Sequence, residues 1–189
     1  MKRIWGGVLL AACLTITTQQ VYAYNTFNQH KLKYGVSGQH YWIDSSAAGY
    51  TTTIQTAMNE WIYTTSYWGV TTPISYTKAT TKSESRMDIY GTNLSTDWYA
   101  ITSMYDGSGT LINPNNTDWV WGMIRYSDSY PGLSSDKKKA VMAHEMGHVM
   151  GLAHTSYTQA VMRPDIGYCT DAIYRAQPND LAGINVLYN

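Results

Sequence analysis

Cysteine, phenylalanine and charged residues are scarce in this chain of 189 residues, which contains two cysteines, one phenylalanine and 14% charged residues. Two cysteines are too few for a scaffold built on disulfides. Lysine plus arginine and aspartate plus glutamate number 13 each, so the formal net charge is zero. Because neutralisation of phosphates requires a basic excess, this balance excludes a protein that binds nucleic acid in that way.

Long apolar runs are missing as well. The run over residues 4–16 is interrupted by glycine, cysteine and threonine. It is also shorter than the ~20 residues that cross a bilayer, so we expect no transmembrane segment. Hydrophobic residues nevertheless make up 44% of the chain, and tyrosine and tryptophan number 17 and 7. This content is sufficient for a packed core, and the length suits one domain.

The amino terminus has the three parts of a secretory signal peptide: a basic start, the apolar run, and small or modest residues at Val21-Tyr22-Ala23. We therefore expect a signal peptide over residues 1–23, a mature domain over residues 24–189 and a secreted, extracellular protein. An alternative stays open, because Leu10-Ala11-Ala12-Cys13 resembles a bacterial lipobox. In that case Cys13 would carry a lipid that anchors the protein at the cell surface.

The spacing of apolar residues predicts a mixed α/β (α+β) domain. The clearest helix covers residues 51–63, where apolar residues recur at i, i+3, i+4, i+7 and i+8. A second helix is capped by Ser134 or Ser135, runs through Met150 and stops near Gly151. The remaining expectations are a helix over 180–187, strands over 39–44, 74–78, 87–90 and 119–126, loops and strand edges within 64–85, and turns over 104–116.

The stretch from His144 to His154 carries the candidate chemistry. Residues four apart on a helix project from the same face, so His144 and His148 can hold one zinc ion. Glu145 leaves the same turn about 100° away and can stand beside the metal without binding it. Gly151 can adopt a positive φ, and the resulting turn can return His154 to the same ion. Three imidazoles leave one tetrahedral position for water, as in catalytic zinc sites.

These residues fit the pattern H-E-x-x-H-x-x-G-x-x-H, and the chain resembles the metzincin zinc metalloproteases, in particular a bacterial secreted form of the matrixin-like branch. Met162, in Ala160-Val161-Met162-Arg163-Pro164, is similar to the methionine of the Met-turn. In the family this methionine forms an apolar floor beneath the imidazoles and does not bind the metal. The resemblance implies a metzincin-like catalytic domain, with a twisted mixed sheet, two long helices and a small C-terminal subdomain that carries the Met-turn and a final helix.

The resemblance further implies that residues 24–189 form the catalytic domain of a monomeric, zinc-dependent endopeptidase with a protein or peptide substrate and one catalytic zinc. Glu145 would act as general base towards a zinc-activated water and then return the proton to the leaving amine. Two alternatives stay open. A zinc amidase that acts on cell-wall peptides would use the same chemistry, and an inactive zinc-binding adhesion module would share the fold.

Substrate contacts are expected at two places. Metzincins pair an extended peptide with an exposed edge strand, and residues 122–126 are the candidate edge because they precede the helix of the site. The candidate substrate residues on this strand are Gly122, Met123 and Ile124. Tyr168 either lines the pocket for the side chain after the scissile bond or packs in the core.

Other candidate sites are less specific. Asp106, in Asp106-Gly107-Ser108-Gly109, resembles a residue of a calcium-binding loop in animal matrixins, and a solvated turn is the alternative. No structural zinc is expected, because only His30 and His40 remain as spare imidazoles and neither lies in a matching motif. Cys169 would be the single thiol of the mature chain, either a small buried side chain or a regulatory one.

Overall fold

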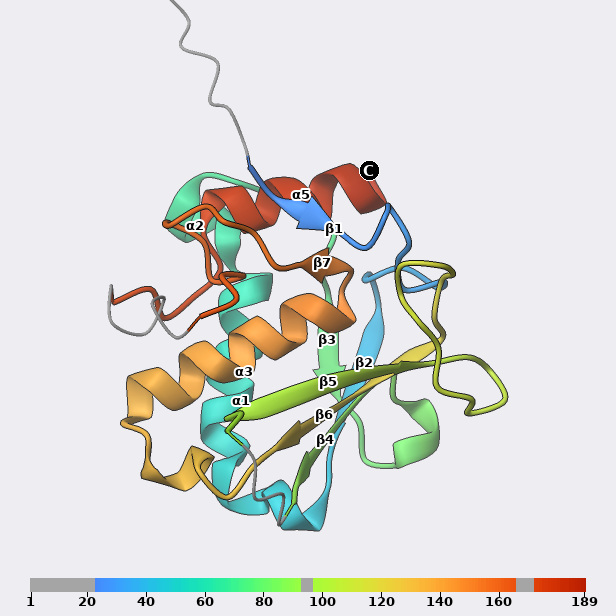
Figure 1. Cartoon of the computed structure of the whole chain (residues 1–189), viewed down its shortest axis with the longest axis vertical. Helices are drawn as coiled ribbons and strands as arrows, with labels where there is room; N and C mark the ends of the chain where they lie inside the picture. Colours follow the sequence, from blue (N-terminus) through green and yellow to red (C-terminus); the bar gives the residue numbers. More distant parts are fainter. Residues whose placement is uncertain (1–22, 93–96, 166–171) are drawn as a thin grey trace, which may run out of the picture.

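The computed structural model describes residues 23–92, 97–165 and 172–189 (Figure 1). The expected signal peptide and Cys13 lie outside these ranges, as do Tyr168 and Cys169. No helix in the described ranges has the length and hydropathy needed to span a membrane.

A five-stranded mixed sheet forms the centre of the domain. Its strands are β2 (Gln39–Ile43), β3 (Tyr76–Lys78), β4 (Met87–Gly91), β5 (Ala100–Tyr105) and β6 (Trp121–Tyr126). They lie in the order β3-β2-β4-β6-β5 (Figure 1). The first four strands pair in parallel, whereas β5 is antiparallel to β6. This arrangement confirms the predicted α/β class and its mixed sheet.

Two long helices, α1 (Thr51–Ile62) and α3 (Ser135–Val149), pack against each other beside the sheet (Figure 1). The Trp61 indole N–H of α1 donates to the carbonyl of Ala143 in α3 at 3.0 Å. Helix α3 in turn contacts β5 and β6. The buried residues of α1 follow the predicted apolar stripe: Ile54, Ala57, Met58 and Trp61.

Several short elements complete the described chain. Helix α2 (Thr64–Trp68) occupies residues expected to be a loop, and it ends at Gly69, whose φ of +68° is left-handed. Helix α5 (Pro178–Tyr188) is the expected final helix. Strands β1 (Asn25–Thr26) and β7 (Leu152–Ala153) form an antiparallel pair. Three 3-10 helices are η1 (Ser45–Tyr50), η2 (Lys82–Glu84) and η3 (Tyr130–Gly132).

The prediction that residues 122–126 form the substrate edge is wrong. Strand β6 lies between β4 and β5 and pairs with both of them, so β5 forms the edge beside α3. The order of strands along the chain does not reveal this arrangement, because β6 follows β5 in the sequence but lies between β4 and β5 in the sheet. Ile124 is fully buried, and Gly122 lies under α3 against Val149. The residues proposed to contact substrate on this strand therefore lie in the interior of the sheet.

We predict from the close packing at Gly122 that a larger residue there destabilises the fold. A Cβ there would lie 2.7 and 2.8 Å from the two Val149 methyl carbons. We expect Gly122→Ala to lower the free energy of unfolding by about 1–3 kcal/mol, because the helix or the strand must shift. Urea unfolding of the two chains measures this. Gly132→Ala is the matched control, since a Cβ there meets no atom within 4 Å; equal stability of both variants would refute the close approach.

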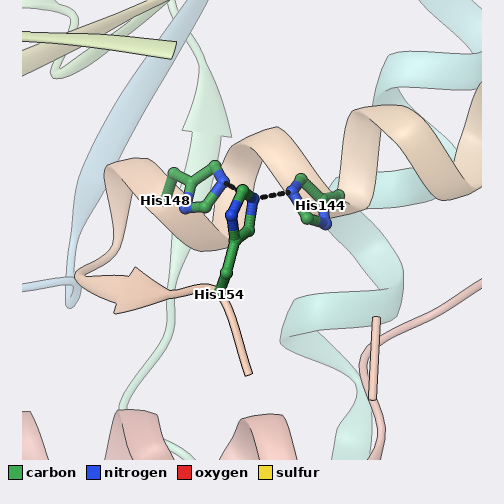
Figure 2. Close-up of side chains that lie close together, drawn as sticks. All are labelled: His144, His148 and His154. Atoms are coloured by element: carbon green, nitrogen blue, oxygen red, sulfur yellow. Dashed lines mark hydrogen bonds between the residues drawn. The ribbon is translucent and has the colours of Figure 1, made fainter. Parts of the chain in front are cut away.

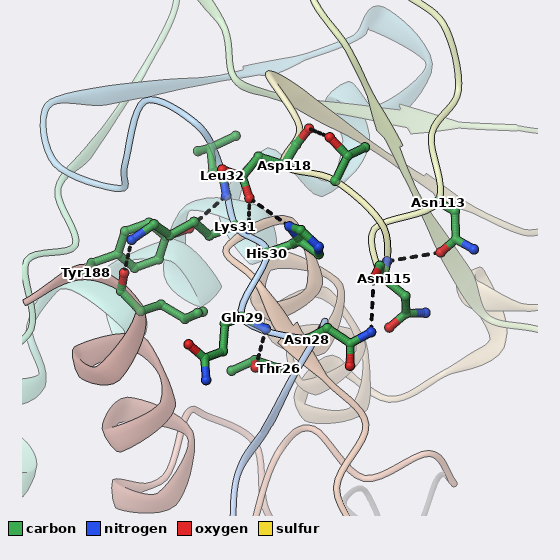
Figure 3. A network of polar contacts seen from close by, with 12 residues as sticks. Thr26, Asn28, Gln29, His30, Lys31, Leu32, Asn113, Asn115, Asp118 and Tyr188 are labelled. Carbon is green, nitrogen blue, oxygen red and sulfur yellow. Dashed lines mark hydrogen bonds and ion pairs between the residues drawn. The ribbon is translucent and has the colours of Figure 1, made fainter.

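The amino-terminal segment lies across the domain and contacts distant parts of the chain (Figure 3). The Asn28 amide donates to the carbonyl of Asn115 at 3.0 Å, and the Lys31 backbone N–H donates to Asp118 Oδ1 at 2.9 Å. The Leu32 N–H donates to the Tyr188 hydroxyl oxygen at 3.0 Å. These bonds hold the segment between the loop that precedes β6 and the last turn of α5.

Candidate active site

The structure brings His144, His148 and His154 together. The first two come from successive turns of α3, and the third follows β7, after a turn at Gly151 with φ +106°. Figure 2 shows the three rings pointing toward one another, with His154 Nε2 at 3.1 Å from His144 Nε2 and 3.2 Å from His148 Nε2. One nitrogen from each ring lies within 4.8 Å of the others. Positive φ at Gly151 is the conformation that the sequence analysis required there.

Hydrogen bonds define which nitrogens face the centre of this cluster. His144 Nδ1 lies 2.7 Å from the Val161 carbonyl, and His148 Nδ1 lies 2.8 Å from the Leu152 carbonyl. A carbonyl oxygen only accepts, so both Nδ1 atoms carry the proton. Each Nε2 atom therefore directs a lone pair at the centre, which is the arrangement of metal-binding imidazoles.

The electrostatics of the cluster also fit a cation. Burial, the largest cause, lowers the pKa of His148 to about 4. For His154 and His144 burial is again the largest cause, and the charge of His148 is the second. Together they lower the pKa of His154 to about 4 and that of His144 well below its usual value. All three rings are therefore neutral near pH 7. The Nε2 lone pairs of His144 and His148 both point at Nε2 of His154. One proton on His154 Nε2 cannot bond both of them, whereas a divalent cation can bind all three nitrogens.

Glu145 lies on the same helix turn and is only 7% exposed. Its Oε2 atom accepts a hydrogen bond from the Thr102 hydroxyl of β5 at 2.6 Å. Burial raises the pKa of Glu145 to about 7, and the bond from Thr102 partly opposes this rise. A cation held nearby would lower the pKa again, because it favours the charged carboxylate.

Met162 packs against α3 at Gly147, between the two helical histidines. A Cβ at Gly147 would lie 2.4 Å from Met162 Sδ, so only glycine leaves room for this side chain. The Met162 carbonyl accepts the backbone N–H of Thr155, the residue after His154, at 2.9 Å. The segment around Met162 therefore supports the cluster from both the helix and the third histidine.

Asp180, near the start of α5, forms a hydrogen bond with the same segment. Its Oδ2 atom accepts the backbone N–H of Val161 at 3.0 Å and that of Gln177 at 2.9 Å. Because the Val161 carbonyl accepts from His144, one carboxylate supports a histidine through a single residue. The sequence predicts Asp180 at the start of a helix but not in this role. Its signal is a capping box, with Gln177 as N-cap and Asp180 at N3.

A cleft of about 820 Å³ opens beside the histidines. One wall is β5, the floor includes Val141 and Glu145 of α3, and Pro164 follows the Met162 segment. Large apolar side chains are exposed along it, among them Trp98 at 64%, Ile101 at 42% and Leu111 at 64%. Gly122, Met123 and Ile124 are not among the described residues that line this cleft.

Asp106 lies in the segment between β5 and β6. Its Oδ1 atom accepts from the Ser108 hydroxyl at 2.7 Å, the Ser108 backbone N–H at 2.9 Å and the Thr110 N–H at 2.8 Å. These bonds, led by that of the Ser108 hydroxyl, lower the pKa of Asp106. Within the described ranges, the three histidines are the only group of three or more potential metal ligands. A calcium site at Asp106 stays a prediction.

Known proteins share sequence and fold with this chain. The matrixin family model matches residues 26–189. Matrix metalloproteinase-19 of Mus musculus is 32% identical over 108 residues, which are 48% of this chain and 20% of that protein. Macrophage metalloelastase of Oryctolagus cuniculus is 28% identical over 134 residues, which are 64% of this chain and 26% of that protein.

The chain thus spans about a fifth to a quarter of the length of these relatives. Among solved structures, myroilysin shares the fold with a TM-score of 0.56, at 14% identity, over 90% of this chain and 89% of its own. Because the matrixin model covers nearly all of the described residues, this chain belongs to the matrixin family, a branch of the metzincins.

Proposed function

We propose that this protein is a zinc-dependent endopeptidase that hydrolyses peptide bonds with Glu145 as its general base. The convergence of three imidazole nitrogens within 4.8 Å, with a buried carboxylate on the same helix turn, is the observation that carries the proposal. Membership of the matrixin family supports the same conclusion, because two relatives are named as a matrix metalloproteinase and a metalloelastase.

His144, His148 and His154 are the proposed ligands, through their Nε2 atoms. Zinc, when bound there, supplies positive charge that acidifies a water molecule and polarises the scissile carbonyl. Glu145 takes the proton of the attacking water and later delivers it to the leaving nitrogen as the carbon–nitrogen bond breaks. Burial raises the pKa of Glu145 in the metal-free chain to about 7, and a bound cation lowers it, so the carboxylate is ionised and ready to accept the proton near neutral pH.

An extended peptide is the proposed substrate, bound along the open edge of β5. The carbonyls of Tyr99 and Tyr105 accept bonds from the β6 side, from Ser127 and Val120. Successive residues of a strand point their backbone groups in opposite directions. Ala100 and Thr102 therefore present an N–H and a carbonyl to the cleft, where a peptide can add as a further strand.

Export and domain limits are proposed from the amino-terminal pattern. Residues 1–23 would form the signal peptide and residues 24–189 the catalytic domain, with lipid attachment at Cys13 as the alternative. The matrixin match, which begins at residue 26, supports this boundary.

The function is tested by incubating the purified chain with casein, a peptide library and peptidoglycan fragments, followed by mass spectrometry. We expect cleavage within proteins, one zinc per chain by metal analysis, loss of cleavage with a zinc chelator, and recovery when zinc is returned. Cleavage of peptidoglycan fragments alone would instead identify an amidase. Zinc binding without any cleavage would identify a binding module and overturn the proposal.

A further inference from the structure

We propose that Thr102 is a positioning residue that holds the carboxylate of Glu145 in its working orientation. The inference rests on the proposed function, in which Glu145 is the base. It adds a specific residue on the substrate-binding strand to the machinery of that base.

Two contacts join Thr102 to Glu145 across 43 residues of sequence. The Thr102 hydroxyl donates to Glu145 Oε2 at 2.6 Å and lies 3.2 Å from the backbone carbonyl of the same residue. A hydrogen bond to an ionised group is short and strong compared with a neutral one. The hydroxyl thus contacts both the backbone carbonyl and the carboxylate of Glu145, which restricts how the Glu145 side chain can rotate.

The hydroxyl is itself held rigidly. Threonine is branched at Cβ, so few χ1 rotamers are open to it. Its backbone lies in β5, where Thr102 is opposite Ile124 of β6, a residue that is fully buried. The sheet therefore fixes the position of the hydroxyl relative to α3, and the hydroxyl transmits that position to Glu145.

The role of the second oxygen follows from this geometry. With Oε2 engaged by Thr102, Oε1 is the oxygen that takes the proton of the attacking water. A base that is free to rotate spends less time in the productive orientation, and misplacement by about 1 Å can reduce a rate by about 100-fold. Substrate affinity does not depend on this contact, because an extended peptide binds the backbone of β5.

Thr102→Val tests the inference, because it keeps the shape of threonine and removes the hydroxyl. We expect kcat on a peptide to fall by about 10- to 100-fold, with KM within about twofold of wild type and the zinc content unchanged. Thr102→Ser restores the hydroxyl and should recover most of kcat. Thr77→Val, an exposed threonine of β3, is the matched control and should behave as wild type.

A crystal structure of the Thr102→Val variant gives a readout independent of activity. We expect the Glu145 carboxylate to leave the position that it occupies in the wild type. An active wild type with an unimpaired Thr102→Val, or a Thr102→Ser as impaired as Thr102→Val, overturns this inference alone. A wild-type chain that cleaves no peptide overturns the proposed function and this inference together.

Discussion

Glu145→Gln is expected to lower kcat/KM by about 10²- to 10⁴-fold, the range that a general acid–base group contributes. Glutamine keeps the size of the side chain and an oxygen that can accept the bond from Thr102. It cannot take a proton from water at neutral pH, so the loss isolates proton transfer from packing. Steady-state cleavage of a fluorogenic peptide measures the effect.

The zinc content of Glu145→Gln should match that of the wild type, because the proposed ligands are the three histidines. Glu84→Gln is the control for this substitution, since Glu84 lies in η2 and is exposed. We expect the control to cleave at the wild-type rate. Casein hydrolysis at a normal rate by Glu145→Gln would refute the role of Glu145 as base.

Asp180→Ala is expected to have the largest effect on stability, lowering the free energy of unfolding by about 2–4 kcal/mol. The substitution removes half of the capping box of α5 and leaves the buried N–H of Val161 without its acceptor. Since the Val161 carbonyl also orients His144, we expect zinc affinity to fall by about 10-fold. Urea unfolding and titration against a chelator measure the two effects.

The pH dependence of this destabilisation has a definite sign. Burial raises the pKa of Asp180 to about 6, whereas the pKa of an aspartate in an unfolded chain is about 3.9. The folded chain holds the proton of Asp180 more tightly than the unfolded chain. Protonated Asp180 therefore contributes stability that is fully present below about pH 4 and is lost as the pH rises through about 6. Asp180→Ala should therefore destabilise more at about pH 4.5 than at about pH 8.

Asn179→Ala is the neighbouring control for Asp180→Ala. Asn179 is also buried, but its side-chain oxygen accepts the backbone N–H of Ala23, which the proposed cleavage removes, and not one from the Met162 segment. We expect some loss of stability and no change in zinc affinity. Equal zinc affinities for wild type and Asp180→Ala would contradict the link from α5 to His144.

Local patterns explain what could be predicted from the sequence. The stripe of α1 and the H-E-x-x-H spacing lie within one or two helical turns, so the geometry of a helix is sufficient to place those residues. The return of His154 required one further feature, the positive φ of Gly151. The mixed sheet followed from strand-like runs, but the order of its strands depends on contacts that no run contains.

The features missed are those made by distant residues. The edge strand β5 has the sequence Ala-Ile-Thr-Ser-Met-Tyr, without regular alternation of apolar and polar residues, so it gave no strand signal. Thr102 meets Glu145 across 43 residues, and Asp180 meets Val161 across 19. In a chain rich in threonine, nothing local distinguishes the one hydroxyl that reaches the carboxylate.

The short pairing of β1 with β7 bears on how the protein is produced for experiments. Asn25 donates from its side chain to the carbonyl of His154 at 2.8 Å, and the Phe27 ring lies 5.9 Å from that of His148. A recombinant chain that started at residue 28 would lack both contacts, and a bulky tag fused next to Asn25 would crowd the backbone at His154. Affinity tags therefore belong after Asn189, which is exposed at the far end of α5.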